Sequence, residues 1–166
     1  MRGPTPAPAT AGRGCSGGAN ASGAASASTG PAADLIRVAL SAPASASTGT
    51  AVRVSTRLVM LGDGPRFVFR PETSRLELSR SGVLVALTAA APGTAVPMQP
   101  RGGQERPAQT LPTTIILGGC DGAPVPPGRY DLRAVVGYGE DPLAGASGGQ
   151  AGGFTLVSGA VPLMVT

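Results

Sequence analysis

The chain has 166 residues and a net charge of +4, and all thirteen of its basic residues are arginine. It contains no histidine and no lysine, which excludes a Ser-His-Asp triad, histidine metal ligands, a Schiff-base lysine and a Walker A phosphate loop. Nine acidic residues are mixed among the arginines, so the charge is too weak for a nucleic-acid-binding surface. We therefore expect one non-enzymatic domain with no cofactor, no metal site and no nucleic-acid partner. Arginine without lysine, together with abundant alanine, glycine and proline, indicates a bacterial genome of high GC content.

Residues 1–33 contain no Val, Ile, Leu, Phe, Tyr or Trp and consist mostly of Ala, Gly, Ser, Thr and Pro. Such a segment cannot bury enough apolar surface to offset the entropy cost of ordering. We predict a disordered tail or linker over 1–33 and a folded domain over 34–166. Neither the apolar run of a signal peptide after Met1 nor a membrane-spanning stretch of about eighteen apolar residues is visible in the sequence.

One short motif in the tail, Gly14-Cys15-Ser16-Gly17-Gly18, resembles the start of a mature bacterial lipoprotein. The resemblance implies that Cys15 is acylated, that the protein meets the membrane only through this lipid, and that it lies in the cell envelope or outside the cell. Gly12 and Arg13 depart from the pattern, because small or apolar residues are usual at those positions. A flexible tail with an incidental cysteine is the alternative. A cytoplasmic location also stays open, because no signal peptide is visible.

From Asp34 onward, apolar residues recur at every second position, which is the pattern of half-buried strands. No segment of about eleven residues carries the 3.6-residue stripe of an amphipathic helix. The pattern predicts an all-β fold, an antiparallel sandwich of about seven to eight strands, because a parallel sheet would need crossover helices. The proline-rich residues 89–109 are expected to cross irregularly between the sheets. The expected strands are 35–40, 52–60, a short one with Phe67 and Phe69, one with Leu76 and Leu78, 83–87, 111–117, 126–138, and 154–166 with a bulge at Ser158-Gly159.

The stretch Pro127-Gly128-Arg129-Tyr130-Asp131-Leu132-Arg133-Ala134 resembles the beginning of strand F in immunoglobulin-like sandwiches. There a tyrosine turns its hydroxyl back onto the upstream backbone, so the resemblance implies a structural tyrosine corner at Tyr130. The motif is also similar to bacterial immunoglobulin-like modules, including the intracellular proteinase inhibitor family. The chain lacks the disulfide pair and core tryptophan of antibody domains, so the resemblance implies a fold and no activity.

We expect the functional surface to lie on loops, because loops carried by a rigid scaffold are the usual place for binding. The candidate contact loops are Asp63 to Pro65, with Asp63 and Gly64, then Pro92 to Pro107, and Glu140 to Gly153, with Glu140 and Asp141. The expected function is that of a secreted or surface-tethered binding or structural module whose partner is an unknown protein or cell-envelope component. The alternative is a protease-inhibitor-like sandwich that acts through an exposed loop.

Other candidate sites have simpler alternatives. Cys15 and Cys120 could pair in an exported protein, but a free Cys120 in a turn is favoured. Glu140 and Asp141, with Asp131 or Asp121, could form a calcium site, but solvated loop acids are favoured because no EF-hand spacing is present. Seven arginines could line one face for an anionic ligand, against ordinary outward-facing charge partly paired with Glu77 and Asp131. They are Arg53, Arg57, Arg66, Arg70, Arg75, Arg129 and Arg133.

Overall fold

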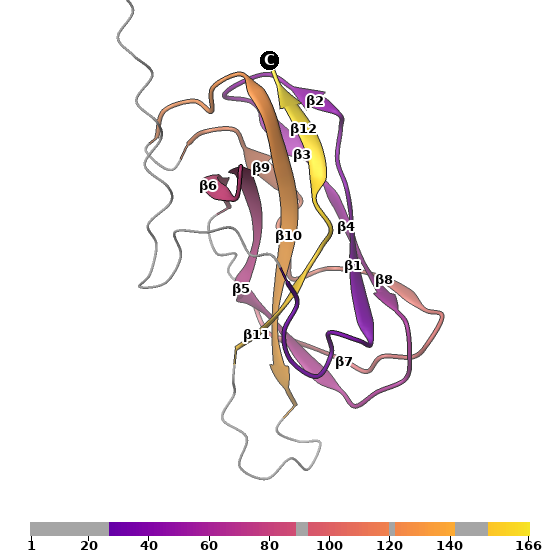
Figure 1. Ribbon diagram of the computed structural model, residues 1–166. Helices are drawn as coiled ribbons and strands as arrows, with labels where there is room; N and C mark the ends of the chain where they lie inside the picture. The colour runs from indigo at the N-terminus through magenta and orange to yellow at the C-terminus, as the bar shows by residue number, and fades with distance from the viewer. Residues whose placement is uncertain (1–26, 89–92, 120–121, 142–152) are drawn as a thin grey trace, which may run out of the picture.

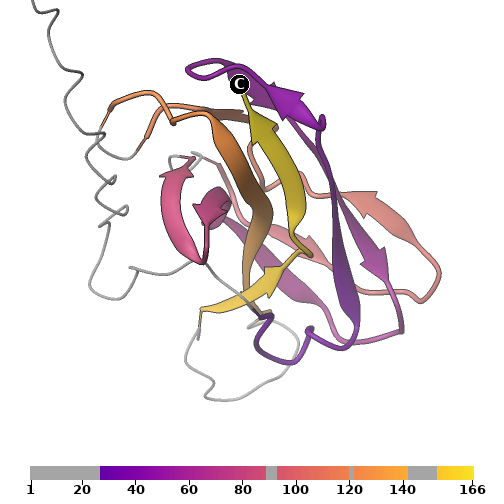
Figure 2. The same cartoon turned by 45° about the horizontal axis from the view of Figure 1, so that its top comes forward.

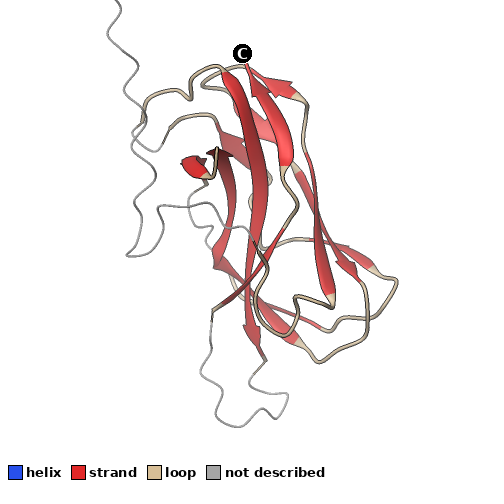
Figure 3. Cartoon of the chain, viewed as in Figure 1, coloured by secondary structure: helices blue, strands red, loops and turns tan. Residues whose placement is uncertain are grey.

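A computed structural model of the chain describes residues 27–88, 93–119, 122–141 and 153–166. Over these residues the protein is all-β, with twelve strands and no helix (Figures 1 and 3). The strands are β1 (Ile36–Ser41), β2 (Ser45–Ala46), β3 (Ala51–Arg53), β4 (Ser55–Met60), β5 (Phe67–Arg80), β6 (Val83–Leu87), β7 (Val96–Met98), β8 (Glu105–Pro107), β9 (Thr114–Ile116), β10 (Gly128–Glu140), β11 (Phe154–Val157) and β12 (Val161–Val165).

The strands form two layers that pack face to face as a sandwich (Figure 2). One layer is a seven-stranded sheet of order β2-β12-β10-β5-β6, with β11 also beside β10 and β7 beside β5. The other layer joins the sheets β1-β4-β8 and β3-β9, because only Val54 separates β3 from β4. The Val54 N–H donates to the carbonyl of Thr113 at 2.8 Å, which continues the β3-β9 pairing across this junction. Within the described residues, one strand pair, β12 with β2, is parallel.

The core lies between the layers and is built from the alternating positions that the sequence pattern predicts. Because successive side chains of a strand point to opposite faces, every second residue of each central strand enters this space. The inward rows are Ile36 and Val38 on β1, Val52, Val54, Leu58 and Met60 along β3 and β4, Leu76 and Leu78 on β5, and Leu132, Ala134 and Val136 on β10; all of them are buried.

β5 is one strand of 14 residues, where two separate strands were expected. Its pairing with β10 jumps from Arg75 opposite Val135 to Arg70 opposite Gly137, so residues 71–74 bulge out of the ladder. Pro71 has no N–H to donate to a ladder, which suits it to such a bulge. On one side of the bulge β5 pairs with β7 and on the other with β6, so the irregularity lets one strand serve two neighbours.

The proline-rich connection crosses from one sheet to the other, as expected, but it is less irregular than predicted. Its described part contains β7 on the seven-stranded sheet and β8 beside β4 in the other layer. The expected last strand, 154–166, is divided into β11 and β12, which lie on either side of the Ser158-Gly159 position. Its two halves pair with different parts of the same long strand, β10.

The end of the predicted tail, residues 27–33, belongs to the folded unit. The Thr29 N–H donates to the carbonyl of Thr155 at 2.7 Å, and the Val157 N–H donates to the Ser28 hydroxyl at 2.8 Å. These hydrogen bonds place the segment alongside β11, so polar contacts order it where its composition offers little apolar surface. The remainder of the predicted tail, 1–26, lies outside the described residues.

Candidate functional site

Parts of the three predicted contact loops meet at one end of the sandwich, while residues 92 and 142–152 of these loops lie outside the described residues. Phe67, the first residue of β5, lies opposite Glu140 of β10 on one side and opposite Met98 of β7 on the other. The turn before β5, the segment after β7 and the end of β10 are therefore neighbours, at the lower end of Figure 1. We call the described residues 61–66, 99–104 and 140–141 the loop end.

Hydrogen bonds join two of these segments to each other. The Gly102 N–H donates to the Asp63 carboxylate at 2.7 Å, and the Gly64 N–H donates to the carbonyl of Pro100 at 3.3 Å. The side-chain amide of Gln99 donates to the carbonyl of Gly64 at 3.3 Å. Asp63 and Gly64, predicted as contact residues, thus also hold two distant turns together and give the loop end a preformed shape.

The two acidic candidates at the end of β10 differ in environment. Glu140 is exposed, whereas Asp141 is 4% exposed and forms an ion pair with the Nε of Arg66. The interpretation of Asp141 as a solvated loop acid is therefore wrong, because the turn before β5 brings an arginine against it. The described part of the chain contains no group of three or more His, Cys, Asp or Glu side chains placed to hold a metal ion.

The loop end exposes both apolar and charged side chains. Leu61 is 55% exposed, and Arg101, Asp63 and Glu140 are also exposed. Arg66 keeps part of its side chain in solvent while it binds Asp141. The loop end therefore exposes one large apolar side chain and charges of both signs.

The seven arginines do not gather on one face. Arg53 and Arg57 lie on β3 and β4, whereas the other five lie at or on β5 and β10 in the opposite layer, so the outward faces of the two sets point in opposite directions. Four of them form ion pairs with acidic residues: Arg57 with Glu105, Arg66 with Asp141, Arg70 with Glu72, and Arg75 with Glu77. The seven arginines therefore form no single anion-binding face, and two of them, Arg66 and Arg75, pair with the buried acids Asp141 and Glu77.

Tyr130 lies at the start of β10 and is 2% exposed. Its hydroxyl donates to the carbonyl of Pro126, four residues upstream, at 2.7 Å. The guanidinium carbon of Arg80 lies 5.6 Å from the centre of the ring, within the range of a cation–π contact. These contacts tie the proline-containing turn to the strand that follows it.

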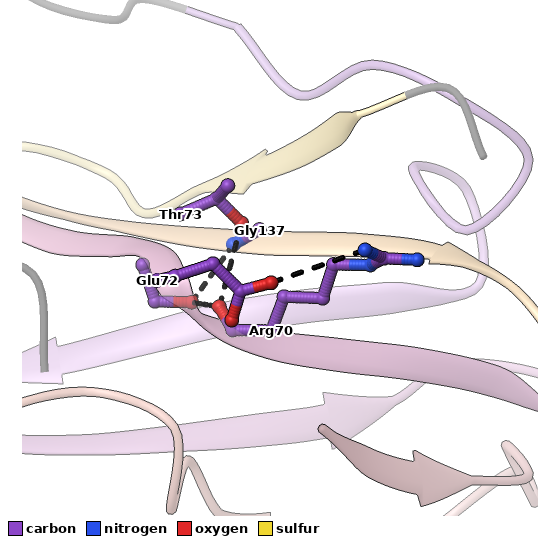
Figure 4. A network of polar contacts seen from close by, with 5 residues as sticks. Arg70, Glu72, Thr73 and Gly137 are labelled. Atoms are coloured by element: carbon purple, nitrogen blue, oxygen red, sulfur yellow. Dashed lines mark hydrogen bonds and ion pairs between the residues drawn. The ribbon is translucent and has the colours of Figure 1, made fainter. Parts of the chain in front are cut away.

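A polar network holds the bulge of β5 against β10 (Figure 4). The Ser74 hydroxyl donates to the carbonyl of Arg70 at 2.7 Å and accepts the Gly137 N–H at 3.0 Å. A side chain at position 137 has no room, since a Cβ there would lie 1.8 Å from the Oγ1 of Thr73. The Ser74 hydroxyl donates its proton to a backbone carbonyl, whereas an activated serine nucleophile donates to a general base. The contacts of Ser74 are therefore those of a structural residue.

Tyr138, on the same face of β10 as Tyr130, makes a contact that the sequence did not reveal. Its hydroxyl donates to the carbonyl of Thr29 at 2.7 Å and accepts the Ala32 N–H at 3.0 Å, so it binds the segment 27–33 directly. The ring packs against Phe154 with centroids 5.6 Å apart. Burial raises the pKa of Tyr138 above its usual value of 10.0, and the negative charge of Glu140 adds to the rise, while the hydrogen bond from Ala32 opposes it.

Sequence reasoning also missed a cavity beside residues 54–56. The available signal was Thr56, a polar residue in the inward row of β3 and β4 that is otherwise apolar.

Cys15 and Cys120 lie outside the described residues, so acylation and disulfide pairing stay predictions. Among the described residues there is no helix of the length and apolar character needed to cross a membrane.

Comparisons with known proteins give little support for any family. No protein-family model matches the chain, and no curated protein matches it. Among solved structures, the chain is similar to Spo0M, a sporulation control protein from Bacillus subtilis, with a TM-score of 0.45 and 12% sequence identity. The match covers 79% of this chain and 49% of that protein, so the chain spans about half of its length. A likeness of this level carries no argument about function.

Proposed function

We propose that the chain is a non-enzymatic binding module, an immunoglobulin-like sandwich that contacts a protein partner of the cell envelope through the loop end. The observation that carries the proposal is the meeting of three sequence-distant segments at one end of the sandwich. Because hydrogen bonds such as Asp63 to Gly102 already hold this end in shape, little conformational entropy would be lost on binding.

The chemistry of the loop end favours a protein surface as the partner. Protein interfaces combine an apolar centre with a polar and charged rim. Leu61 supplies an exposed apolar side chain, and Asp63, Arg101 and Glu140 supply charges of both signs. A partner with an apolar depression flanked by charged groups would complement this arrangement.

The immunoglobulin-like part of the proposal is supported by the tyrosine at the start of β10. Its hydrogen bond to the carbonyl of Pro126 has the form expected of a tyrosine corner, and functional loops at one end of a sandwich are typical of immunoglobulin-like domains. Tethering through an acylated Cys15 rests on the Gly14-Cys15-Ser16 motif. The absence of catalysis rests on the absence of histidine and lysine from the sequence.

Site-specific photo-crosslinking in cells that naturally make the protein tests the binding surface. A photo-reactive amino acid replaces Leu61, Arg101 or, as a control of similar exposure, Ile116 on β9. We expect one shared cross-linked partner from the two loop-end positions and none from Ile116. Equal cross-linking from Ile116, or none from Leu61 and Arg101, would refute the proposal.

Location and the inhibitor alternative need separate experiments. The gene expressed with its native upstream DNA should place the protein in the cell envelope or the medium, and Cys15→Ser should release it from membranes. A wholly cytosolic product would refute the export part alone. The inhibitor alternative is implied by the resemblance to the intracellular proteinase inhibitor family. It would be refuted if the protein at micromolar concentration left a panel of bacterial proteases fully active.

A further inference from the structure

The segment 28–35 touches two separate places in the sandwich, and we call it the strap. Residues 28–33 lie beside β11 and Tyr138, whereas Leu35 contacts the turn 61–64 of the loop end (Figure 1). A displacement of the strap at its first contact would therefore reach the second through only a few residues of chain.

The first contact leaves no room for a side chain on the strap. A Cβ at Gly30 would lie 2.4 Å from the Cγ of Phe154 and 2.5 Å from the hydroxyl oxygen of Tyr138. Gly30 also has a φ of 84°, a conformation that other residues rarely adopt. The glycine thus lets the backbone come close enough for the Tyr138 hydroxyl to bond both the Thr29 carbonyl and the Ala32 N–H.

Ala32 joins the first contact to the second through its own backbone. Its N–H donates to the Tyr138 hydroxyl at 3.0 Å, and its carbonyl accepts the N–H groups of Leu35 and Ile36, each at 3.0 Å. The carbonyl of Leu35 then accepts the N–H of Leu61 at 2.8 Å. Hydrogen bonds therefore connect Tyr138 to the loop end by way of two strap residues.

The side chain of Leu35 supports the turn at the loop end. A Cβ at Gly64 would lie 2.6 Å from the Cδ1 of Leu35, and one at Gly62 would lie 3.4 Å from its Cδ2, so the turn packs directly on this leucine. The Gly64 N–H donates to the carbonyl of Pro100 at 3.3 Å. Leu35 therefore also supports the contact between two loop-end segments.

The strap is held with less apolar burial than the strands. Among residues 28–33, Ala32 alone is buried, and the other contacts of the segment with β11 and Tyr138 are mainly hydrogen bonds. Segments with few buried apolar contacts open at a smaller free energy than the whole domain unfolds. The strap therefore has two states, seated and released, that are accessible while the sheets stay folded.

We propose that the strap regulates the loop end, which keeps its binding shape only while the strap is seated on Tyr138. The inference rests on the function proposed above, because it assigns a control element to that same binding surface. Release of the strap withdraws Leu35 from the turn 61–64 and weakens partner binding. Since the two equilibria are linked, a bound partner in turn favours the seated strap.

Amide hydrogen exchange of the full chain tests the coupling without a partner. Gly30→Ala unseats the strap at a distance from the loop end, and Gly49→Ala is the matched control, with a φ of 73° and no atom within 4 Å of the new Cβ. Relative to the amides of β10, exchange at Gly64 and Gly102 should rise at least about fivefold in Gly30→Ala, and less than about twofold in Gly49→Ala. Thermal unfolding of each variant confirms that it is folded.

A second pair of variants tests the role of Leu35 as a positioning residue. Leu35→Ala removes the support of the turn and should also speed exchange at Gly64. Leu35→Met keeps a similar apolar volume and should leave this exchange close to the wild-type rate. Equal exchange at Gly64 in both variants would overturn the assignment of the coupling to this side chain.

Photo-crosslinking from position 101 then measures binding in cells that naturally make the protein. Gly30→Ala should lower the yield of the cross-linked partner at least about fivefold, and Gly49→Ala should leave it unchanged. Unchanged loop-end exchange in Gly30→Ala, or an unchanged cross-link yield despite faster exchange, would overturn the inference. Faster exchange in Gly30→Ala with no cross-linked partner in the wild-type protein would instead refute the proposed function and support the coupling alone.

Discussion

Replacing Tyr138 by Phe removes one oxygen atom and leaves the packing of the ring in place. The ring lies within 6 Å of three phenylalanines, with centroid distances of 5.5 Å to Phe67, 5.9 Å to Phe69 and 5.6 Å to Phe154. A phenylalanine fills the same space, so this cluster is expected to survive. The change falls on the two hydrogen bonds that the hydroxyl makes to residues 27–33.

The two lost bonds are unequal. The carbonyl of Thr29 belongs to an exposed residue and can turn to water, whereas the Ala32 N–H belongs to a residue that is 0% exposed. A buried donor left without a partner costs about 1–3 kcal/mol. We therefore expect Tyr138→Phe to lower the free energy of unfolding by about 1–3 kcal/mol, out of roughly 5–15 kcal/mol for a typical domain.

Urea unfolding measures the global loss, and amide hydrogen exchange shows where it arises. Protection should fall at Ala32 and along β11, because Ser28 and Thr29 hydrogen-bond to that strand. Tyr130→Phe is the matched control, because the Tyr130 hydroxyl donates to the carbonyl of the exposed Pro126. This substitution should lower the free energy of unfolding by about 0.5–1.5 kcal/mol and leave hydrogen exchange at 27–33 unchanged. A Tyr138→Phe protein with wild-type stability and wild-type exchange at Ala32 would refute the reasoning.

High pH provides a second measure of the same residue. Burial raises the pKa of Tyr138 above 10.0, so above pH 10 the unfolded chain loses this proton while the folded chain keeps it. Because the unfolded state then binds fewer protons, stability must fall as the pH rises through this window. The fall should be steeper in the wild-type protein than in Tyr138→Phe, as measured by urea midpoints at increasing pH; equal slopes would contradict it.

Two further predictions concern the bulge and the loop end. Gly137→Ala should destabilise the protein by about 2 kcal/mol or more, because the new Cβ would lie 1.8 Å from the Oγ1 of Thr73 and 3.1 Å from its backbone carbon. Urea unfolding in a double-mutant cycle tests this, and Thr73→Gly should recover only part of the lost stability. Full recovery would show that the side chain alone causes the clash. Arg66→Met should cost about 1–3 kcal/mol by removing an ionic partner of the buried Asp141, whereas Arg66→Lys should cost less because it keeps the charge. Equal thermal midpoints for Arg66→Met and the wild-type protein would mean that the ion pair contributes nothing to stability.

The central strands could be predicted because their signal is local. Val52, Val54, Leu58 and Met60 alternate with Arg53, Ser55, Arg57 and Val59, and the four are buried in the sandwich. Side chains of a strand point alternately to its two faces, so a pattern of two residues reports burial on one face without knowledge of the partner strand. The same argument located β1, β6 and the long strand β10 within a few residues of their observed bounds.

The short strands could not be predicted in this way. β2, β7 and β8 have two or three residues each, and several of their side chains are exposed, so they show no alternation. They exist because a distant strand offers hydrogen-bonding groups, as β5 does for β7. The single course of β5 through Pro71 has the same origin, since β10 pairs with both halves of the strand.

The candidate site was predictable as a set of loops and not as a surface. Asp63, Gly64, Glu140 and Asp141 were identified from turn composition, which indicates where the chain leaves a sheet. Composition carries no information on which turns meet, so the contact of Asp63 with Gly102 and the burial of Asp141 against Arg66 were not foreseen. The cavity beside residues 54–56 was missed for a related reason, because three residues, 54–56, separate two strand pairings on one side and six residues, 108–113, separate them on the other.

The sequence by itself determined that this protein is an all-β sandwich, through alternation along its central strands and the absence of a helical period. Its lack of histidine and lysine also limited the chemistry that it could perform. Only the tertiary structure decided that residues 27–33 are held by Tyr138, that parts of three loops share one end, and that a cavity lies beside Thr56. These features depend on strand register, which pairs residues as far apart as Phe67 and Glu140, and register is set by the whole sheet and not by any one segment.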